Sequence, residues 1–258
     1  MKRLIINADD FGFTPDVNAG IVHAHREGIL TATTLMANGT SFDDAVRLAR
    51  ETPTLDIGCH LVLIQGESLS TGWPLPETAR QLVVALSRRH IDVYQELRAQ
   101  VQKILSTGLR PTHLDSHKHT HALPSVFRVV VRIAHEFEIP YVRLPFDAAL
   151  PFARVPLRLA RNRYCGWTQG YNVSMTDHFT GFRLTGSLAE KSFAAAIFSL
   201  REGLTEFMCH PGFLGPELLQ AQTRLKESRL RELEALTSPR IRQVIAAHGV
   251  QLESFSGR

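Results

Sequence analysis

Two adjacent aspartates near the start of the chain, Asp9 and Asp10, follow a short apolar run and precede a turn at Gly12. Each carboxylate makes the other harder to ionise, so a pair at the end of a predicted strand favours a shared cation or proton. An ordinary acidic turn is the alternative, because Asp and Gly are common turn residues. The chemistry of the pair therefore depends on the side chains that the fold brings to it.

Three histidine-bearing segments lie far from the aspartates in the sequence, each at or near the predicted end of another strand. They are 58–61 around His60, 112–121 around His117 and 208–212 around His210. Two imidazoles and one carboxylate can bind a divalent metal ion and leave positions open for water, as in catalytic zinc sites. The same set of ligands occurs in non-haem iron oxygenases, so the residue types predict a metal site without choosing the metal.

A metal ion in such a site would lower the pKa of water and make hydroxide available near neutral pH. A second carboxylate nearby can act as a general base, so the aspartate pair supplies one carboxylate for each role. The cation would also relieve the repulsion within the pair. We therefore expect the metal-free protein to hold one extra proton near neutral pH and to release it when the ion binds.

Strand alternation separates the histidines from the cysteines beside them. Cys59 and His60 must point to opposite faces of their strand, and so must Cys209 and His210. If the histidines face the site, the cysteines pack under the helices as small apolar side chains. We therefore expect neither cysteine to be a nucleophile or a metal ligand.

In the second histidine segment, His113, Asp115 and His117 share one face while the chain stays extended, and Ser116 points to the other face. Ser116 is the only hydroxyl between Leu114 and Lys118, so a covalent route through a serine is not expected. His119 and His121 lie beyond the predicted end of the strand, and the pattern assigns no role to either.

Strand-like and helical patterns alternate along the chain, which favours a parallel sheet with helices outside it. The predicted strands cover 3–9, 31–36, 56–63, 111–116, 140–144, 204–209 and 250–255. The predicted helices lie near 16–27, 41–51, 77–87, 92–106, 124–138, 188–202 and 217–247. About seven such units predict an α/β fold, a distorted β/α barrel of a single domain, with a doubly wound open sheet as the alternative. In a barrel the strand ends converge on one face, which brings both aspartates near His60, His117 and His210.

Two segments rich in Pro and Gly, 64–76 and 145–186, break this rhythm, and each follows a predicted strand. We expect them to be loop insertions in one domain that spans 1–258. Because sites in barrels lie at the carboxyl ends of the strands, these loops could shape a substrate cleft. Irregular surface cover is the alternative.

The composition is that of an ordinary globular protein, with 44% hydrophobic and 21% charged residues and a net charge of +4. Aromatic and basic residues are not interleaved, so a nucleic-acid partner is not expected. No run of about 18 apolar residues predicts a transmembrane helix. The three widely spaced cysteines do not suggest a disulfide framework, which favours a cytoplasmic protein.

A basic stretch at 152–167 could lie at a membrane interface. On a helix, Arg154, Arg158 and Arg161 would fall on one side, and a basic amphipathic helix with aromatic residues can bind a bilayer surface. A helix that packs its apolar side on the barrel is the alternative, and Pro156 weakens any helix that begins at 152.

Three motifs together resemble the YdjC-like carbohydrate deacetylases. They are Asn-Ala-Asp-Asp-Phe-Gly at 7–12, Gly-x-His-Leu at 58–61 and Thr-His-Leu-Asp-Ser-His-x-His-x-His at 112–121. They occur in the family's order and at matching distances over most of the chain. Within the family, the strings at 208–212 and 233–241 are similar to the hopanoid biosynthesis-associated deacetylases. The resemblance implies a distorted β/α barrel and metal-dependent hydrolysis, with zinc or magnesium, of N-acetyl groups on amino sugars.

The resemblance also implies roles for individual residues. Asp10, His60 and His117 match the three metal ligands. Asp9 matches the general base that takes a proton from the attacking water, and His210 matches a histidine that protonates the departing amine. Hydrolysis would then proceed by direct attack of water, without a covalent intermediate.

Two further residues belong to the predicted site. Asp115 could orient a neighbouring histidine, as carboxylates behind metal ligands often do. Arg143, at another predicted strand end, could contact the substrate or the developing oxyanion, and a structural ion pair is its alternative.

The expected substrate is an N-acetylglucosaminyl hopanoid lipid, with chitobiose-type oligosaccharides as the alternative. A lipid-linked substrate would place the protein in the cytoplasm with peripheral contact to the inner face of the membrane. A homodimer is compatible with the sequence.

Three other classes of function are compatible with a metal site. A phosphoesterase would need a Gly-rich phosphate cradle or clustered arginines near the motifs, and an iron oxygenase would need a cosubstrate site. The sequence shows neither pattern. A sugar- or metal-binding module without catalysis would tolerate the loss of Asp9, which this chain retains.

Overall fold

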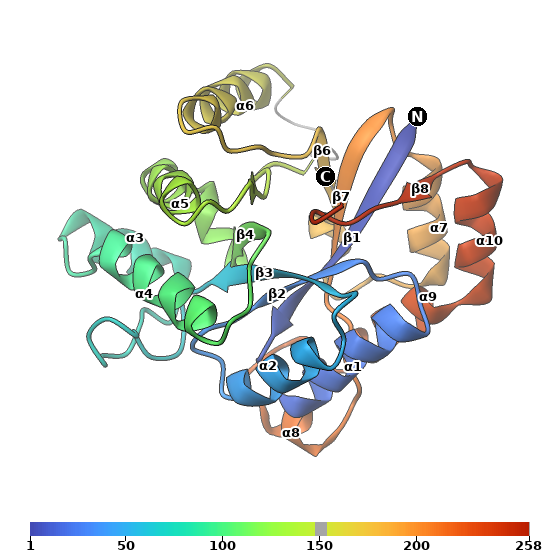
Figure 1. Ribbon diagram of the computed structural model, residues 1–258, viewed down its shortest axis with the longest axis horizontal. Helices are drawn as coiled ribbons and strands as arrows, with labels where there is room; N and C mark the ends of the chain where they lie inside the picture. Colours follow the sequence, from blue (N-terminus) through green and yellow to red (C-terminus); the bar gives the residue numbers. More distant parts are fainter. Residues whose placement is uncertain (148–153, 258) are drawn as a thin grey trace.

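Parallel strands form one curled sheet in the computed structural model, which describes residues 1–147 and 154–257 (Figure 1). In chain order the strands are β1 (Lys2–Phe11), β2 (Ala32–Leu35), β3 (Asp56–Leu61), β4 (His113–Ser116), β5 (Tyr141–Val142), β6 (His178–Thr180), β7 (Gly203–Cys209) and β8 (Gln251–Leu252). Across the sheet they follow the order β5-β4-β3-β2-β1-β7-β6, and the short β8 pairs with the start of β1. This is the strand order of a barrel opened between β5 and β6. It confirms the predicted distorted β/α barrel of a single domain and is not the order of a doubly wound sheet.

One short segment reaches across the opening between β5 and β6. Ser174 forms a parallel bridge with Tyr141 of β5, and the Val142 amide donates a hydrogen bond to the Ser174 carbonyl over 2.9 Å. Four residues later, His178 begins β6 and pairs with Thr205 of β7. The same stretch of chain therefore lies beside both edges of the half-barrel.

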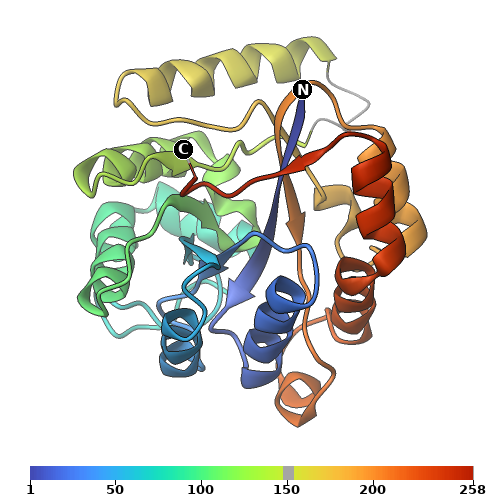
Figure 2. The same cartoon turned by 45° about the vertical axis from the view of Figure 1, so that its right-hand side comes forward.

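Helices cover the outer side of the sheet (Figure 2). They are α1 (Pro15–Arg26), α2 (Phe42–Arg50), α3 (Ala79–Ser87), α4 (Val93–Ser106), α5 (Pro124–Glu136), α6 (Arg154–Gln169), α7 (Glu190–Phe198), α8 (Pro216–Gln220), α9 (Glu227–Thr237) and α10 (Pro239–Ala247), with 3-10 turns at η1 (His117–Ala122) and η2 (Phe182–Leu184). Their starts follow ordinary capping chemistry. The Thr14 side chain accepts from the Val17 amide ahead of Pro15, and Asp92 caps α4 in the same way. No helix among the described residues is long and apolar enough to cross a membrane.

The two faces of β1 differ in chemistry. Leu4, Ile6 and Ala8 belong to the main hydrophobic core between sheet and helices. The residues between them point into the barrel, where Ile5 packs with Phe255 from the chain's end. Nearer the carboxyl end of the strand, the inward residues Asn7 and Asp9 are polar. The interior of the barrel is therefore apolar near the amino end of β1 and polar near its carboxyl end, where the predicted site lies.

Two sequence predictions about elements need correction. The segment 145–186 is not only loop, because it contains α6 and β6. The predicted helix 217–247 is three helices, and Pro239 starts the last of them because proline tolerates the first turn but not a helix interior. The segment 64–76 contains neither helix nor strand, only an isolated antiparallel bridge between Glu67 and Pro74.

The predicted membrane stretch, 152–167, begins outside the described residues, and the side chains of 154–160 also lie outside them. Of the three arginines predicted to share one side of the helix, Arg161 has a described side chain, and its guanidinium donates a hydrogen bond of 2.7 Å to the Asp177 carbonyl.

Candidate active site

An irregularity at the end of β1 lets both aspartates face the same site. Neighbouring residues of a regular strand point to opposite faces. Here the pairing of β1 with β2 shifts register between Ala8 and Phe11, and Asp10 has a φ of 70°, in the left-handed region that residues other than glycine rarely adopt. Both side chains are buried. The bulge therefore turns the Asp10 carboxylate toward the cluster that Asp9 also faces.

Asp10, His60 and His117 converge, as the sequence predicts for a metal site. The Asp10 Oδ1 atom lies 3.4 Å from His60 Nε2 and 3.0 Å from His117 Nδ1. One ligand atom from each residue lies within 4.8 Å of the other two. A carboxylate and two imidazoles at this spacing are a donor set that fits a divalent ion.

Asp115 fixes the orientation of the His60 ring. Its Oδ1 atom lies 2.7 Å from His60 Nδ1, while Thr34 Oγ1 lies 3.1 Å from the same nitrogen and donates to Asp115 Oδ2 over 3.1 Å. This leaves Nε2 to point at Asp10. A carboxylate behind a metal-binding histidine is the usual way to fix its tautomer.

The same contacts determine where a proton resides without metal. Burial of the His60 ring disfavours its charged form, but the carboxylates of Asp115 and Asp10 outweigh that effect and raise the pKa of His60 to about 10. His60 is then an imidazolium at neutral pH. The extra proton expected for the metal-free protein is therefore assigned to His60, between two carboxylates.

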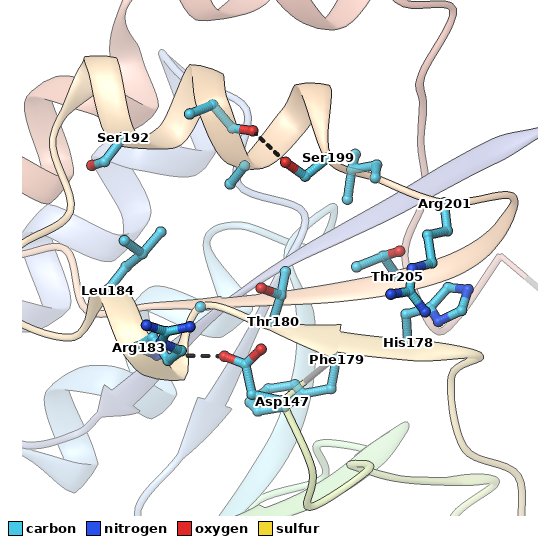
Figure 3. A pocket seen from close by; sticks show the side chains of 14 residues that line it. Asp147, His178, Phe179, Thr180, Arg183, Leu184, Ser192, Ser199, Arg201 and Thr205 are labelled. Atoms are coloured by element: carbon cyan, nitrogen blue, oxygen red, sulfur yellow. Dashed lines mark hydrogen bonds between the residues drawn. The ribbon is translucent and has the colours of Figure 1, made fainter. Parts of the chain in front are cut away.

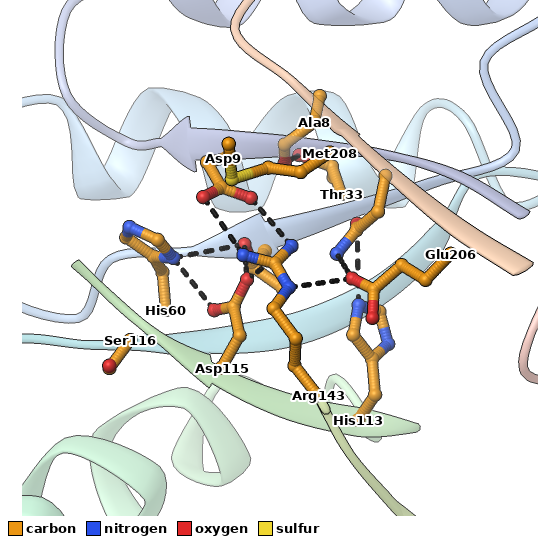
Figure 4. A network of polar contacts seen from close by, with 12 residues as sticks. Ala8, Asp9, Thr33, His60, His113, Asp115, Ser116, Arg143, Glu206 and Met208 are labelled. Atoms are coloured by element: carbon orange, nitrogen blue, oxygen red, sulfur yellow. Dashed lines mark hydrogen bonds and ion pairs between the residues drawn. The ribbon is translucent and has the colours of Figure 1, made fainter. Parts of the chain in front are cut away.

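Arg143 lies beneath Asp9 at the centre of a buried charge network (Figure 4). The Arg143 atoms Nη1 and Nη2 donate to the two Asp9 oxygens over 3.0 and 2.7 Å. Nη2 also pairs with Asp115 Oδ2 at 2.7 Å, and Nε donates to Glu206 Oε1 over 2.7 Å. The side chain is fully buried and is not part of the cavity wall. This geometry matches the ion-pair interpretation of Arg143 rather than contact with substrate.

The network has a strong effect on Asp9. Burial alone would raise the pKa of the Asp9 carboxyl, but the Arg143 guanidinium, with help from His60, holds that pKa well below its usual range. Asp9 is therefore a carboxylate throughout the physiological pH range.

Glu206 and Asn7 extend the network toward the apolar end of the barrel, and neither was predicted to belong to the site. Asn7 Nδ2 donates to Glu206 Oε1 over 3.0 Å, and Asn7 Oδ1 lies 3.3 Å from His113 Nε2. His113 in turn stacks on Phe255 with ring centroids 3.9 Å apart. Glu206 lies on β7 three residues before Cys209, so the inward alternation of that strand was the available signal.

His210 approaches Asp9 from the end of β7. Its Nε2 atom lies 3.9 Å from Asp9 Oδ2, and its backbone amide donates to Glu232 over 2.6 Å. Nδ1 is buried without a hydrogen-bond partner among the described residues. Burial outweighs the attraction of the two aspartates and lowers the pKa of His210 to about 4. The resting imidazole is therefore neutral at neutral pH.

A cavity of about 570 Å³ opens over this cluster and is lined by all five residues predicted to act in catalysis or metal binding. It also contains Arg229, which the sequence reasoning missed. Arg229 Nη2 lies 2.5 Å from Asp10 Oδ2, the oxygen that does not face the histidines. Burial of Asp10 would raise the pKa of its carboxyl, but Arg229 outweighs that effect and holds the pKa well below its usual value. Helical periodicity places Arg229 on one face with Leu233 and Leu236, which was the available signal.

The two histidines without a predicted role lie on η1. His121 Nδ1 is 2.6 Å from Ser116 Oγ, so Ser116 is turned away from Asp10, His60 and His117, as predicted. His119 lines the active-site cavity, and its Nε2 lies 3.1 Å from the Met208 sulfur. Only His119 of this pair therefore reaches the space available to a substrate.

The cysteines behave as predicted. Cys59 and Cys209 belong to the main hydrophobic core, and burial raises the pKa of each thiol well above its usual value. Both are therefore poor nucleophiles and poor metal ligands.

A second cavity, of about 490 Å³, lies beside β6 and α7 (Figure 3). Arg183 and Leu184 of η2 line it, whereas Phe182 and Thr185 line the active-site cavity. The short η2 turn is thus a wall between the two cavities. The five residues predicted to act in catalysis or metal binding line the first cavity and not the second.

Comparison with known proteins agrees with the motifs. A model of the YdjC-like protein family matches residues 3–247. The chain is 36% identical to a carbohydrate deacetylase of Brevibacillus brevis, with 98% of each chain covered, and 34% identical to one of Geobacillus stearothermophilus, with 98% of this chain and 97% of the other covered. A solved structure from Enterococcus faecalis V583, of a protein assigned to cellobiose-phosphate cleavage, matches with a TM-score of 0.82 and 26% identity over 99% of this chain and 98% of that one. The chain therefore belongs to the YdjC-like protein family.

Proposed function

We propose that this protein is a metal-dependent hydrolase that removes the N-acetyl group from an N-acetylated amino sugar. One observation carries the proposal: Asp10, His60 and His117 converge at the base of a cavity in which Asp9 and His210 also meet. The relatives named carbohydrate deacetylases support the same chemistry.

Asp10, His60 and His117 would hold the ion. The donor set favours zinc over magnesium, because magnesium prefers a shell of oxygen ligands. A divalent ion held there supplies Lewis acidity, which polarises an acetamide carbonyl and lowers the pKa of water. Arg229 keeps the second Asp10 oxygen occupied, so the first oxygen faces the histidines.

Asp9 is the general base in this proposal. The two hydrogen bonds from Arg143 hold its carboxylate in a single orientation and keep it ionised. As water attacks the acetamide carbon, Asp9 accepts the water proton.

His210 is the general acid, and its neutral resting state defines how it must act. With a pKa of about 4, it carries no spare proton at neutral pH. The nearest proton source is Asp9 after it has deprotonated water, because Asp9 Oδ2 lies 3.9 Å from His210 Nε2. The proton can then move from Asp9 to His210 and on to the departing nitrogen, which yields acetate and a free amine.

The group attached to the reacting sugar has two candidates. An N-acetylglucosaminyl hopanoid lipid is the first, because the strings at 208–212 and 233–241 resemble deacetylases of hopanoid biosynthesis. A chitobiose-type oligosaccharide is the second. Only the first requires peripheral contact with the cytoplasmic face of a membrane.

The test is acetate release by the purified protein. The protein would be stripped with EDTA, reloaded with zinc or magnesium, and incubated with an N-acetylglucosaminyl lipid and with N,N′-diacetylchitobiose. Acetate should appear only with metal. Asp9→Asn should abolish it, while Asp43→Asn, at an exposed position on α2, should not.

Each other result has a distinct meaning. Absence of acetate from both substrates, with sugar binding retained, would favour a binding module without catalysis. Unchanged release by Asp9→Asn would refute the assignment of the base. Release of phosphate from a sugar phosphate instead would favour the phosphoesterase class.

A further inference from the structure

The entrance of the active-site cavity carries an exposed aromatic ring. Phe182 lines the cavity and is nevertheless 47% exposed, whereas Asp10 and His60 at the base are at most 4% exposed. A ligand that covers this ring would gain binding free energy as the apolar area leaves water. We therefore expect Phe182 to contact the part of a ligand that lies nearer the cavity entrance than the reacting group.

The residue before Phe182 shows how the ring is placed. Gly181 has a φ of 105°, and a Cβ atom there would collide with the Met208 backbone of β7. Only glycine allows both this backbone conformation and this close approach. Gly181 thus allows the η2 turn to pack directly against β7, close to the end of the strand that leads to His210.

His119 supports the same ring from the other side. The two rings meet edge to face, with centroids 4.7 Å apart and planes at 88°. His119 and Lys118 before it both have a φ of 52°, a conformation that residues with side chains rarely adopt and that is concentrated at binding sites. The ring of Phe182 is thereby held in place before any ligand arrives, which reduces the entropy lost on binding.

The surroundings of Phe182 indicate the chemistry of its ligand. Thr185, Gln222 and Arg224 line the same cavity and offer a hydroxyl, an amide and a guanidinium. A sugar ring combines an apolar C–H face, which can stack on an aromatic ring, with hydroxyl groups at its edge. A wholly apolar lipid would cover the aromatic ring but remove water from the polar groups without replacing their hydrogen bonds.

We propose that Phe182 forms a subsite for a second sugar ring, the one joined to the N-acetylated sugar that reacts. This proposal rests on the proposed deacetylase function and makes Phe182 a specificity-determining residue. The second ring stacks on Phe182, so a disaccharide gains affinity over a monosaccharide through this side chain.

The experiment compares two substrates in three variants of the metal-loaded protein. Acetate release is measured with N-acetylglucosamine and with N,N′-diacetylchitobiose. Phe182→Ala should raise KM for the disaccharide roughly 3- to 10-fold, with kcat and the monosaccharide kinetics unchanged. Phe182→Tyr, which keeps the ring, should restore the disaccharide KM. Phe198→Ala, at a 59% exposed phenylalanine on α7, is the matched control and should behave as wild type.

Equal losses with both substrates, or no change in Phe182→Ala, would overturn the subsite. Calorimetric binding of chitobiose, the deacetylated disaccharide, separates this proposal from the proposed function because it needs no turnover. Weaker binding by Phe182→Ala than by wild type supports the subsite even if no acetate is released, and equal binding overturns it.

Discussion

Arg143 donates hydrogen bonds to both carboxylate oxygens of Asp9, at 3.0 and 2.7 Å, although the two residues are 134 positions apart in the chain. The guanidinium also contacts Asp115 and Glu206, so one cation faces three buried carboxylates. Asp115 is at the same time the carboxylate that orients His60. The geometry of the proposed general base and that of a proposed metal ligand are therefore linked through one arginine.

Removing that arginine should destabilise the fold as well as the site. Arg143→Met would leave three carboxylates buried without their cation, and breaking a buried pair in this way costs about 3–5 kcal/mol. Urea denaturation should show a loss of this size in the free energy of unfolding. The control is Arg98→Met, which removes a half-exposed pair with Glu136 and should cost about 1 kcal/mol or less. Equal effects of the two substitutions would show that the network is not structural.

Asp115→Asn should weaken metal binding without removing a ligand. Asparagine keeps the shape but loses the charge that fixes the His60 ring, and substitutions behind a metal ligand lower affinity by about 10- to 100-fold. Competition with a chromophoric chelator would measure the change. Asp9→Asn, which alters a neighbouring carboxylate that is not a predicted ligand, should leave the affinity close to that of wild type. If both variants bind metal like wild type, Asp115 does not act through His60.

Metal binding should release close to one proton per ion near neutral pH. The pKa of about 10 means that the His60 imidazole is protonated in the metal-free protein, and a ligand nitrogen must give up its proton. Calorimetry in buffers with different ionisation enthalpies would count the protons. Release should disappear as the pH rises through about 10, and no release at neutral pH would contradict the assignment to His60.

The same shift has a consequence for the metal-free fold. The folded pKa of His60 lies above the unfolded value of 6.5. Its contribution to stability is therefore fully present below pH 6.5 and is lost as the pH rises toward 10. The unfolding free energy of the EDTA-treated protein should fall across this range more than that of a His60→Gln variant.

His210→Gln should slow catalysis and leave metal binding intact. A missing general acid typically lowers the rate about 10²- to 10⁴-fold. Acetate release should fall by this factor while chelator competition is unchanged, because His210 Nε2 faces Asp9 rather than the ligand set. His90→Gln, at an exposed position outside the cavity, is the control. A near-normal rate would mean that the departing amine takes its proton from elsewhere.

Much of the site could be predicted from the sequence because its key residues follow apolar strand patterns. In a parallel barrel the carboxyl ends of the strands lie on one face, so the sequence could predict that Asp10, His60 and His117 lie close together. Strand alternation likewise predicted that Cys59 and Cys209 would be buried in the core.

Other features were decided by tertiary structure. The strand β6 has only three residues, too few for an alternating pattern to be recognised in the sequence, and its pairing with β7 defines it. The left-handed conformation of Asp10 arises from the shifted register with β2, and it allows adjacent residues to share a site that regular alternation would deny them.

The charge pairing depended most on the fold. Arg229 on α9 reaches Asp10 across 219 positions, and Glu206 meets Arg143 across 63. In a sequence each looks like an ordinary charged residue, because nothing local distinguishes a buried charge from a solvated one. The sequence by itself determined which residues could bind a metal and move a proton. Only the tertiary structure decided which buried cation balances each carboxylate, since that choice depends on distances between segments far apart in the chain.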